Sequence, residues 1–189
     1  MKAKYTTTAK PQVGGAVFRA PLGTELPTNA TDTLNSAFEE LGYCSDDGVT
    51  SSQSTETFEN VAWGGDTVNS GIKSKTVSLK AKLIEALNVA TLKAVYGEDN
   101  VTGDLDTGIT VKVNSTDVEE SSWVVDMIMR GGVVKRIVVP DVKLSEIGDV
   151  VYKDDESVGY EITLKALPDD DNQVQYEYIQ KIDSDESDS

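Results

Sequence analysis

The most restrictive feature of the sequence is a strict alternation of apolar and polar residues that ends at position 83. The apolar members are Val77, Leu79, Ala81 and Leu83, and serine or lysine stands at each position between them. Because successive side chains of a β-strand point to opposite faces, this pattern predicts a strand with one buried face and one solvated face, continuing to Leu87. The run Val158–Ala166 alternates in the same way. The chain is therefore expected to build a sheet over an apolar core.

A short helix is predicted directly after this strand, over Val89–Tyr96. Asn88 has the side chain of an N-cap, and Gly97 supplies a C-terminal stop. Leu87 and Leu92 are spaced to form a hydrophobic staple around the cap. A helix of this length needs a sheet to pack against, so we expect it to cap one.

The segment 121–130 differs from the alternating strands because both of its faces are largely apolar. One face would hold Trp123, Val125, Met127 and Met129, and the other Val124, Asp126 and Ile128. A strand of this kind is expected to be covered by protein on both sides. Gly131 and Gly132 follow it, and two glycines between β-rich runs favour a hairpin.

Taken together, these segments predict a mainly β protein with about six or seven strands, an antiparallel β-sandwich or β-barrel with a flanking α-helix. The region Asn29–Leu41 has apolar residues at helical spacing and could add a second helix. A length of 189 residues suits one domain. No apolar run approaches the length that spans a membrane, so we expect no membrane anchor.

Composition argues against most kinds of catalysis. The chain has no histidine and one cysteine, Cys44, which disfavours zinc sites, histidine-based triads and an internal disulfide. Asp46 and Asp47 would raise the pKa of Cys44, so we interpret it as a small buried or turn residue. The acidic pairs Glu119-Glu120 and Asp154-Asp155 are interpreted as solvated surface, because nothing near them suggests an apolar pocket. We expect no enzymatic activity and no cofactor.

Two polar turns resemble ligand sites without meeting the full pattern. Asp104–Gly108 begins like a calcium loop, but Ser115 stands where an EF-hand requires a glutamate, so calcium binding is not predicted. Trp63-Gly64-Gly65-Asp66 is interpreted as a packed turn rather than a stacking platform for a ligand.

The formal net charge of −16 disfavours ordinary nucleic-acid binding, which depends on lysine and arginine. The charge is uneven, because residues 1–20 contain basic side chains and no acid, whereas residues 169–189 are strongly acidic. The final residues, IDSDESDS, are predicted to form a mobile tail.

Several short motifs together resemble one family. They are Ala20-Pro21-Leu22-Gly23-Thr24, Leu41-Gly42-Tyr43, Asp47-Gly48 and Trp63-Gly64-Gly65. With these motifs the chain, from about Gly15 to Leu167, resembles the major tail (tail tube) proteins of long-tailed bacteriophages of the siphophage type. The resemblance implies a structural virion protein that polymerises into stacked hexameric rings and delivers the genome through their channel. It also implies a location in the phage tail, and in the bacterial host cytoplasm during assembly.

The resemblance further implies several partners and divides the chain into three parts. The partners are other copies of the chain, tail tip or baseplate proteins, a tail terminator and a tape measure protein, with double-stranded DNA passing non-specifically. The parts are an N-terminal arm at 1–27, a β-sandwich at 28–168, and a last strand with the acidic tail at 169–189.

The arm is predicted to be an assembly interface because it is apolar and precedes the core strands. The predicted interface residues are Val17, Phe18, Arg19, Pro21, Leu22 and Leu26. In the alternative interpretation, the arm folds back as an edge strand on its own sandwich. Negative charge should let DNA slide, so the predicted channel-lining residues are Glu56, Glu59, Asp126 and Glu161.

Two other functional classes fit the same sequence. A capsid decoration protein, or another virion structural protein, would share the β-rich pattern and the absence of catalytic motifs. A carbohydrate-binding or hydrolytic β-sandwich would show a saturable ligand or turnover. Microscopy of the purified protein separates these classes, because only the tail tube protein should form tubes with a channel.

Overall fold

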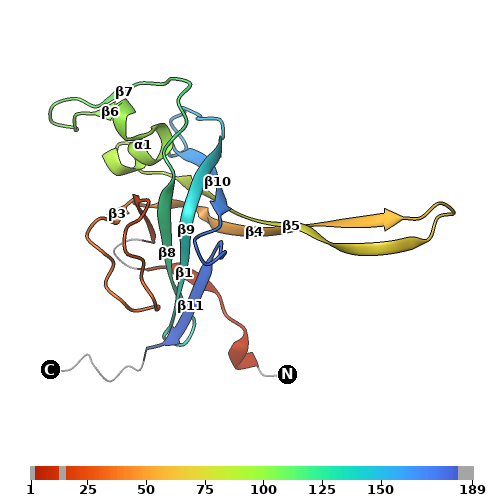
Figure 1. The fold of residues 1–189 in the computed structure, drawn as a ribbon. Helices are drawn as coiled ribbons and strands as arrows, with labels where there is room; N and C mark the ends of the chain where they lie inside the picture. Colours follow the sequence, from red (N-terminus) through yellow and green to blue (C-terminus); the bar gives the residue numbers. More distant parts are fainter. Residues whose placement is uncertain (1–2, 13–15, 183–189) are drawn as a thin grey trace.

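A computed structural model describes residues 3–12 and 16–182, and within these residues nine strands form one antiparallel sheet (Figure 1). Its strands are β1 (Ala9–Pro11), β2 (Val17–Pro21), β3 (Glu39–Glu40), β4 (Cys44–Val61), β5 (Thr67–Leu83), β8 (Ser121–Met129), β9 (Val133–Ile147), β10 (Tyr160–Leu167) and β11 (Tyr176–Lys181). A separate pair is formed by β6 (Val101–Thr102) and β7 (Thr110–Val111). The helical elements are η1 (Ala3–Tyr5), α1 (Val89–Tyr96) and η2 (Glu98–Asn100). The predicted mainly β, antiparallel fold with one flanking helix is confirmed.

The sheet runs in the order β3-β2-β8-β9-β10-β5-β4, with β1 also on β8 and β11 also on β9. The long strand β9 divides it into two halves, because β11 pairs with residues 133–138 and β10 pairs with residues 141–147. We call the strands β1, β2, β3, β8, β11 and the start of β9 the first half. The end of β9 with β10, β5 and β4 forms the second half.

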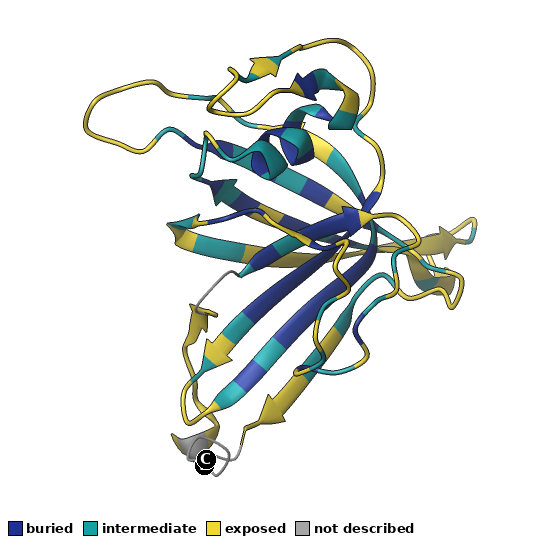
Figure 2. Ribbon diagram, turned by 90° about the vertical axis from the view of Figure 1, so that its left-hand side faces the viewer, coloured by how far each residue is buried: buried dark blue, intermediate teal, exposed yellow. Residues whose placement is uncertain are grey.

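The main core lies between the two halves and beneath α1. It collects the inward residues of the alternating strands, and its fully buried members include Leu83, Val95, Trp123, Val139 and Ile162. A smaller core lies on the opposite face of the first half, around Ala20, Phe38, Val124 and Val138. Figure 2 shows the buried residues in the middle of the long strands and exposed residues at the ends. The prediction that the strand at 121–130 is covered on both faces is therefore confirmed for residues 121–126, whereas residues 127–130 are half-buried or exposed.

The strand predicted to continue to Leu87 ends at Leu83, whereas helix α1 occupies the predicted residues. The Asn88 side chain accepts a hydrogen bond from the Ala90 backbone N–H at 3.0 Å, and the N–H of Gly97 donates to the Lys93 carbonyl at 2.8 Å. Gly97 has φ 95°, which favours glycine. Leu92 is buried, but Leu87 is 66% exposed, so the predicted staple adds no buried contact at Leu87.

The predicted second helix at Asn29–Leu41 is wrong. The segment forms turns and ends in the short strand β3. The Asn29 side-chain oxygen accepts hydrogen bonds from the backbone N–H groups of Thr31 and Asp32 at 2.8 and 2.7 Å. These bonds offer the backbone an alternative to the helix.

The expectation that residues 1–27 form an arm outside the core is wrong for residues 17–21. Strand β2 lies inside the sheet, with β3 on one side and β8 on the other. Val17 enters the main core and Ala20 enters the smaller one. The alternative interpretation, in which this segment folds on its own subunit, is therefore correct for residues 17–21, although β2 is an inner strand rather than an edge.

Candidate assembly surfaces

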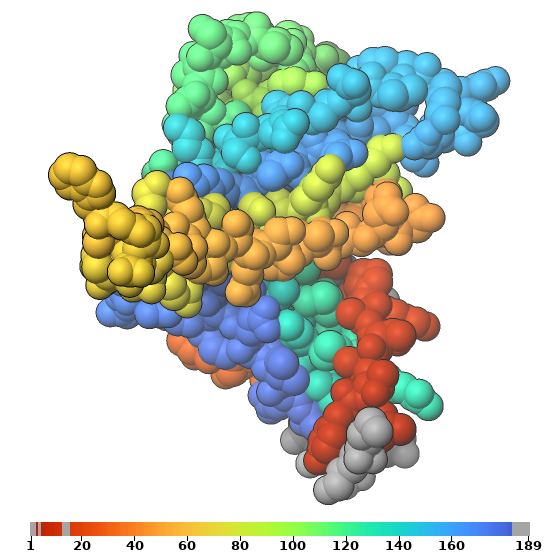
Figure 3. All heavy atoms as spheres, turned by 90° about the vertical axis from the view of Figure 1, so that its right-hand side faces the viewer, coloured from red at the N-terminus to blue at the C-terminus, as the bar shows by residue number. Residues whose placement is uncertain are grey.

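Strands β4 and β5 continue far beyond the body of the protein as a two-stranded hairpin (Figure 1). Every residue from Thr50 to Val61 and from Trp63 to Ser70 is exposed. The space-filling view in Figure 3 looks along the hairpin, which projects toward the viewer from the rest of the surface. Because a lone hairpin buries almost nothing, its exposed side chains are available to another molecule.

The exposed residues of the hairpin include several large apolar side chains. They are Phe58, Val61, Trp63, Val68 and Ile72, and the Trp63 side chain is fully exposed. The turn at the tip forms as predicted, because the Ala62 N–H donates to the Asp66 carbonyl at 2.8 Å and the Gly65 N–H donates to the Ala62 carbonyl at 3.0 Å. The predicted packing of Trp63 within that turn is wrong. Apolar side chains gathered on one projection mark an interaction surface.

Local contacts give the hairpin its own order. The Phe58 ring covers Gly71 on the opposite strand, and a Cβ atom at Gly71 would lie 2.9 Å from that ring. Lys73 forms an ion pair with Glu56 at 2.8 Å. The hairpin therefore has an extended shape before any partner binds.

Two strand edges in the second half are free of partners among the described residues. Strand β4 pairs with β5 alone. Lys143–Ile147 of β9 pair with β10 on one side, but β8 starts with Ser121 opposite Val142 and does not reach them on the other. Unpaired edges of this kind can add a strand from another chain.

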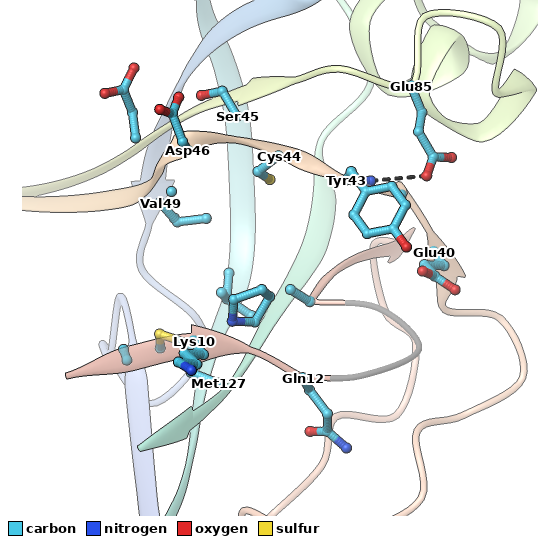
Figure 4. A pocket seen from close by; sticks show the side chains of 17 residues that line it. Lys10, Gln12, Glu40, Tyr43, Cys44, Ser45, Asp46, Val49, Glu85 and Met127 are labelled. Atoms are coloured by element: carbon cyan, nitrogen blue, oxygen red, sulfur yellow. Dashed lines mark hydrogen bonds between the residues drawn. The ribbon is translucent and has the colours of Figure 1, made fainter. Parts of the chain in front are cut away.

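A groove of about 870 Å³ lies between β1 and the start of β4 (Figure 4). Its apolar lining includes Ala16, Val125 and Met127, and its polar lining includes Glu40, Asp46, Asp47 and Glu85. Cys44 also lines the groove and is half-buried, as the sequence analysis expects. Burial raises the pKa of the Cys44 thiol to about 11, so it stays protonated at neutral pH.

The Leu41-Gly42-Tyr43 motif has a structural role at this groove. Glu85 accepts a hydrogen bond from the Tyr43 backbone N–H at 3.1 Å, drawn as a dashed line in Figure 4. The Glu85 carboxylate occupies the space in which a Cβ atom on Gly42 would lie, and Gly42 has φ 76°. Glycine is therefore favoured at this position.

The structure divides the predicted interface residues. Val17 and Arg19 are 1% and 7% exposed, so their predicted role as interface residues is wrong. Phe18 and Leu26 pack against the smaller core. Pro21 and Leu22 are exposed and stay predictions.

Arg19 is held inside the subunit by an ion-pair network. Its guanidinium donates to Glu98 at 2.8 Å, and Lys93 pairs with the other oxygen of Glu98 at 3.0 Å. Burial opposes ionisation of Glu98, but the hydrogen bonds from Lys93 and Arg19 outweigh it and lower the pKa of Glu98. The network links β2 to the end of α1.

The prediction that Asp126 lines the channel is wrong. Asp126 is 4% exposed and forms a two-bond ion pair with Arg136, with N–O distances of 2.7 and 2.8 Å. Arg136 also donates to the carbonyl of Asp32 at 2.7 Å, which ties the loop over the smaller core to β9. Asp126 therefore cannot face a channel. The turn at Gly131-Gly132 could have predicted this pair. In a hairpin with that turn, the strand register places Asp126 directly opposite Arg136.

The other predicted channel residues lie on the surface. Glu56 and Glu59 are exposed on the hairpin, and Glu161 pairs with Lys80 on the polar face of the second half. Further ion pairs on this side join Lys82 to Glu156 at 2.6 Å and Lys143 to Asp117 at 2.8 Å. Hydrogen bonds from Lys153 and Lys82 lower the pKa of Glu156 to about 2. The lysines of this sheet face are thus largely matched by carboxylates.

The described residues contain no group of three metal-binding side chains, and none of their helices is long and apolar enough to cross a membrane. The Asp104 carboxylate accepts hydrogen bonds from the backbone N–H groups of Asp106 and Thr107, at 3.0 and 2.7 Å. The Asp104 carboxylate therefore stabilises the turn that it belongs to, which is an ordinary structural role for a polar loop residue. The acidic tail at 183–189 lies outside the described residues.

A comparison with protein families finds one match that spans nearly the whole chain. The family model described as "Phage tail tube protein" matches residues 10–187 of the 189. No curated protein matches the sequence.

Proposed function

The chain belongs to the phage tail tube protein family, and on that premise we propose that it polymerises into stacked hexameric rings whose channel delivers the genome. Family membership makes it a structural protein of the virion tail. The hexameric ring, the passage of double-stranded DNA and assembly in the host cytoplasm are parts of the proposal.

The β4–β5 hairpin is the observation that carries the proposal. It exposes a tryptophan, a phenylalanine and three branched aliphatic side chains, which a monomer would leave in water. Because the hairpin projects away from its own subunit, we infer that it contacts a different surface on the next copy, which is a head-to-tail contact rather than a two-fold dimer. Head-to-tail contacts between identical subunits generate rings or open polymers.

The two free edges of the second half support ring closure. The edge of β4 and the edge at Lys143–Ile147 lie on opposite sides of the same four-stranded layer. If β4 of one copy pairs with β9 of the next, the layers join into a continuous barrel that has no free edge.

In this arrangement the polar face of the second half would line the channel. Glu161 and the ion-paired lysines Lys80 and Lys82 lie on that face. A lysine that is matched by a carboxylate attracts passing phosphates less than a free one, so DNA could slide without being held. Glu161 remains a proposed channel residue, together with Glu56 and Glu59 on the hairpin.

A head-to-tail polymer also explains why further partners are needed. Its two ends differ, because one end leaves hairpins unoccupied and the other leaves their binding surfaces unoccupied. Tail tip or baseplate proteins and a tail terminator would cover these ends, and a tape measure protein would occupy the channel during assembly.

Sedimentation and negative-stain microscopy of the purified chain test the proposal. We expect rings or tubes with a central channel at high protein concentration. Trp63→Ser should reduce assembly at least tenfold, because it removes the most exposed apolar side chain of the hairpin. Leu105→Ser is the matched control, since Leu105 is 66% exposed but lies outside the hairpin, and it should assemble normally. A chain that remains monomeric at every concentration, even when tail-tip components are added as seeds, would refute the proposal.

A further inference from the structure

The polar face of the second half carries one lysine that differs from the others. Lys165 lies on β10 between Leu164 and Ala166, which both belong to the main core. Because successive side chains of a strand point to opposite faces, Lys165 lies on the polar face, as Glu161 does. The Lys165 side chain is exposed. Lys165 is therefore on the face that would line the channel.

The side chains beside Lys165 offer it no carboxylate. Ser78 of β5 and Lys143 of β9 lie directly opposite Lys165, and Ser52 of β4 continues the row beyond Ser78. Asp141 lies two positions before Lys143 on β9. One of its carboxylate oxygens is buried without a hydrogen-bond partner, and Asp141 forms no ion pair among the described residues. The row that contains Lys165 thus consists of two serines and two lysines.

The other lysines on this face are each matched by a carboxylate of the same subunit. Lys80 pairs with Glu161, Lys82 with Glu156 at 2.6 Å, and Lys143 with Asp117 at 2.8 Å. The Lys165 ammonium group has no ion pair within the part of the chain that the structure describes. Positive charge on this face is therefore left without a counter-charge at Lys165.

Folding of the subunit does not explain this lysine. Like charges directly opposite each other destabilise an antiparallel strand pair, and Lys165 lies opposite Lys143. The Lys143 ammonium group is already occupied by Asp117, which precedes β8. The chain has 33 acidic and 17 basic residues, so carboxylates are plentiful, yet none is placed beside Lys165. This arrangement favours an anion from outside the subunit as the partner of Lys165.

We propose that Lys165 contacts the phosphates of the DNA in the channel and slows its passage. This inference rests on the proposed function, in which the polar face of the second half lines the channel. A hexameric ring would bring the Lys165 side chains of all its copies to one level of the wall. The ion-paired lysines lie in other rows or are already neutralised. Because each phosphate contact is a weak electrostatic one, the ring of Lys165 side chains retards the DNA without holding it.

The rate of genome ejection from phage particles that carry Lys165→Gln tests the inference. Ejection is triggered with fragments of the host envelope and followed by the fluorescence of a DNA-binding dye. At low salt we expect the variant to eject its genome at least about twofold faster than the wild type, because the phosphate contacts are lost. At high salt the two rates should converge, since added ions screen the attraction. Lys165→Arg keeps the charge and should eject at the wild-type rate.

The matched control is Lys112→Gln, which removes the same charge from the subunit. Lys112 is also exposed, and it has no ion pair among the described residues. It follows β7, and its backbone N–H donates to the Asn100 carbonyl at 2.8 Å, so it lies at the α1 end rather than on the polar face. Particles with Lys112→Gln should eject at the wild-type rate.

The outcomes separate this inference from the proposed function. If Lys165→Gln forms normal tubes and ejects at the wild-type rate at low salt, the inference is overturned and the proposed function stands. The same holds if Lys165→Arg or Lys112→Gln accelerates ejection as much as Lys165→Gln does. A loss of tube assembly in Lys165→Gln would place Lys165 in a contact between copies and would also overturn the inference. A failure of the unmodified chain to form tubes would overturn both.

Discussion

Strands β4 and β5 contribute to both the body and the hairpin of this protein, and the two regions are stabilised in different ways. Between positions 77 and 83 β5 alternates regularly and sends its apolar residues into the main core. Between positions 67 and 75 the same strand does not alternate regularly and is almost entirely exposed, including its apolar residues Val68 and Ile72. The first part is stabilised by burial and the second by backbone pairing and a few cross-strand contacts, so the stability of the subunit should reside in the body alone.

This difference explains where charges are tolerated. In the body, Arg19, Asp126 and Arg136 are buried, and each has a charged partner. On the hairpin, Glu59 and Asp66 are exposed, with no ion pair among the described contacts. Equivalent substitutions in the two regions should therefore have very different effects on the free energy of unfolding.

The largest expected effect is that of Asp126→Asn. This change leaves the buried Arg136 guanidinium without a counter-charge, so the free energy of unfolding should fall by about 3–5 kcal/mol. Urea unfolding followed by circular dichroism measures the change. Asp66→Asn at the hairpin tip is the matched control and should alter stability by less than about 0.5 kcal/mol. If Asp126→Asn and Asp66→Asn lowered the free energy of unfolding equally, the proposed difference between the body and the hairpin would be contradicted.

Glu98→Gln should have the next largest effect, a loss of about 1–3 kcal/mol at neutral pH, because Arg19 loses a charged partner. The pKa of Glu98 is lowered below its ordinary 4.5, so the wild-type stabilisation is present above that pH and is lost as the pH falls through the lowered value. The wild type and the variant should therefore converge in acid.

Urea titrations at neutral and acidic pH follow this convergence. Glu56→Gln, which breaks the exposed pair with Lys73, serves as the control and should change little at either pH. A gap between wild type and Glu98→Gln that stays constant down to low pH would show that the effect does not come from ionisation.

Asn88→Ala should cost about 1 kcal/mol, because the N-cap bond to the Ala90 N–H is lost. Thermal unfolding should show a small decrease in midpoint with unchanged cooperativity. Asn60→Ala on the hairpin removes the same side chain where it caps no helix, and should be neutral. A larger decrease in the unfolding midpoint for Asn60→Ala than for Asn88→Ala would contradict this prediction.

Removal of the hairpin is the largest change in sequence, and we expect it to have the smallest effect on the free energy of unfolding. Ser54 and Thr76 lie opposite each other, so residues 55–75 can be replaced by Asn-Gly, which forms a tight turn. The free energy of unfolding should change by less than about 1 kcal/mol, because no core residue is removed. Sedimentation should show a folded monomer that no longer assembles. Loss of cooperative urea unfolding would mean that the hairpin contributes to the body after all.

Local sequence signals were sufficient for several elements. The alternation at Val77–Leu83, the cap at Asn88 and the glycine pair at Gly131-Gly132 each specify structure through residues close together in the chain. The same signals show that the protein is mainly β and that the strand at 121–130 is covered on both faces over residues 121–126. These features depend on side-chain direction and backbone conformation, which neighbouring residues determine.

Other features depended on contacts between distant parts of the chain. No local signal shows that Val17–Pro21 is an inner strand, because its partners are β3 and β8. The burial of Arg19 depends on Glu98, which lies 79 positions away in the sequence. Trp63 fits a packed turn by its local sequence, yet the hairpin carries it away from every surface against which it could pack.

The sequence by itself thus determined that the alternating segments are strands, where helix α1 begins and ends, and which family motifs the chain carries. Only the tertiary structure decided which apolar residues are core and which are left for a partner. The physical reason is that burial depends on what covers a side chain, and a covering segment can come from anywhere in the chain or from another subunit. For β2 that cover comes from the subunit itself, whereas for the hairpin we propose that it comes from the next copy.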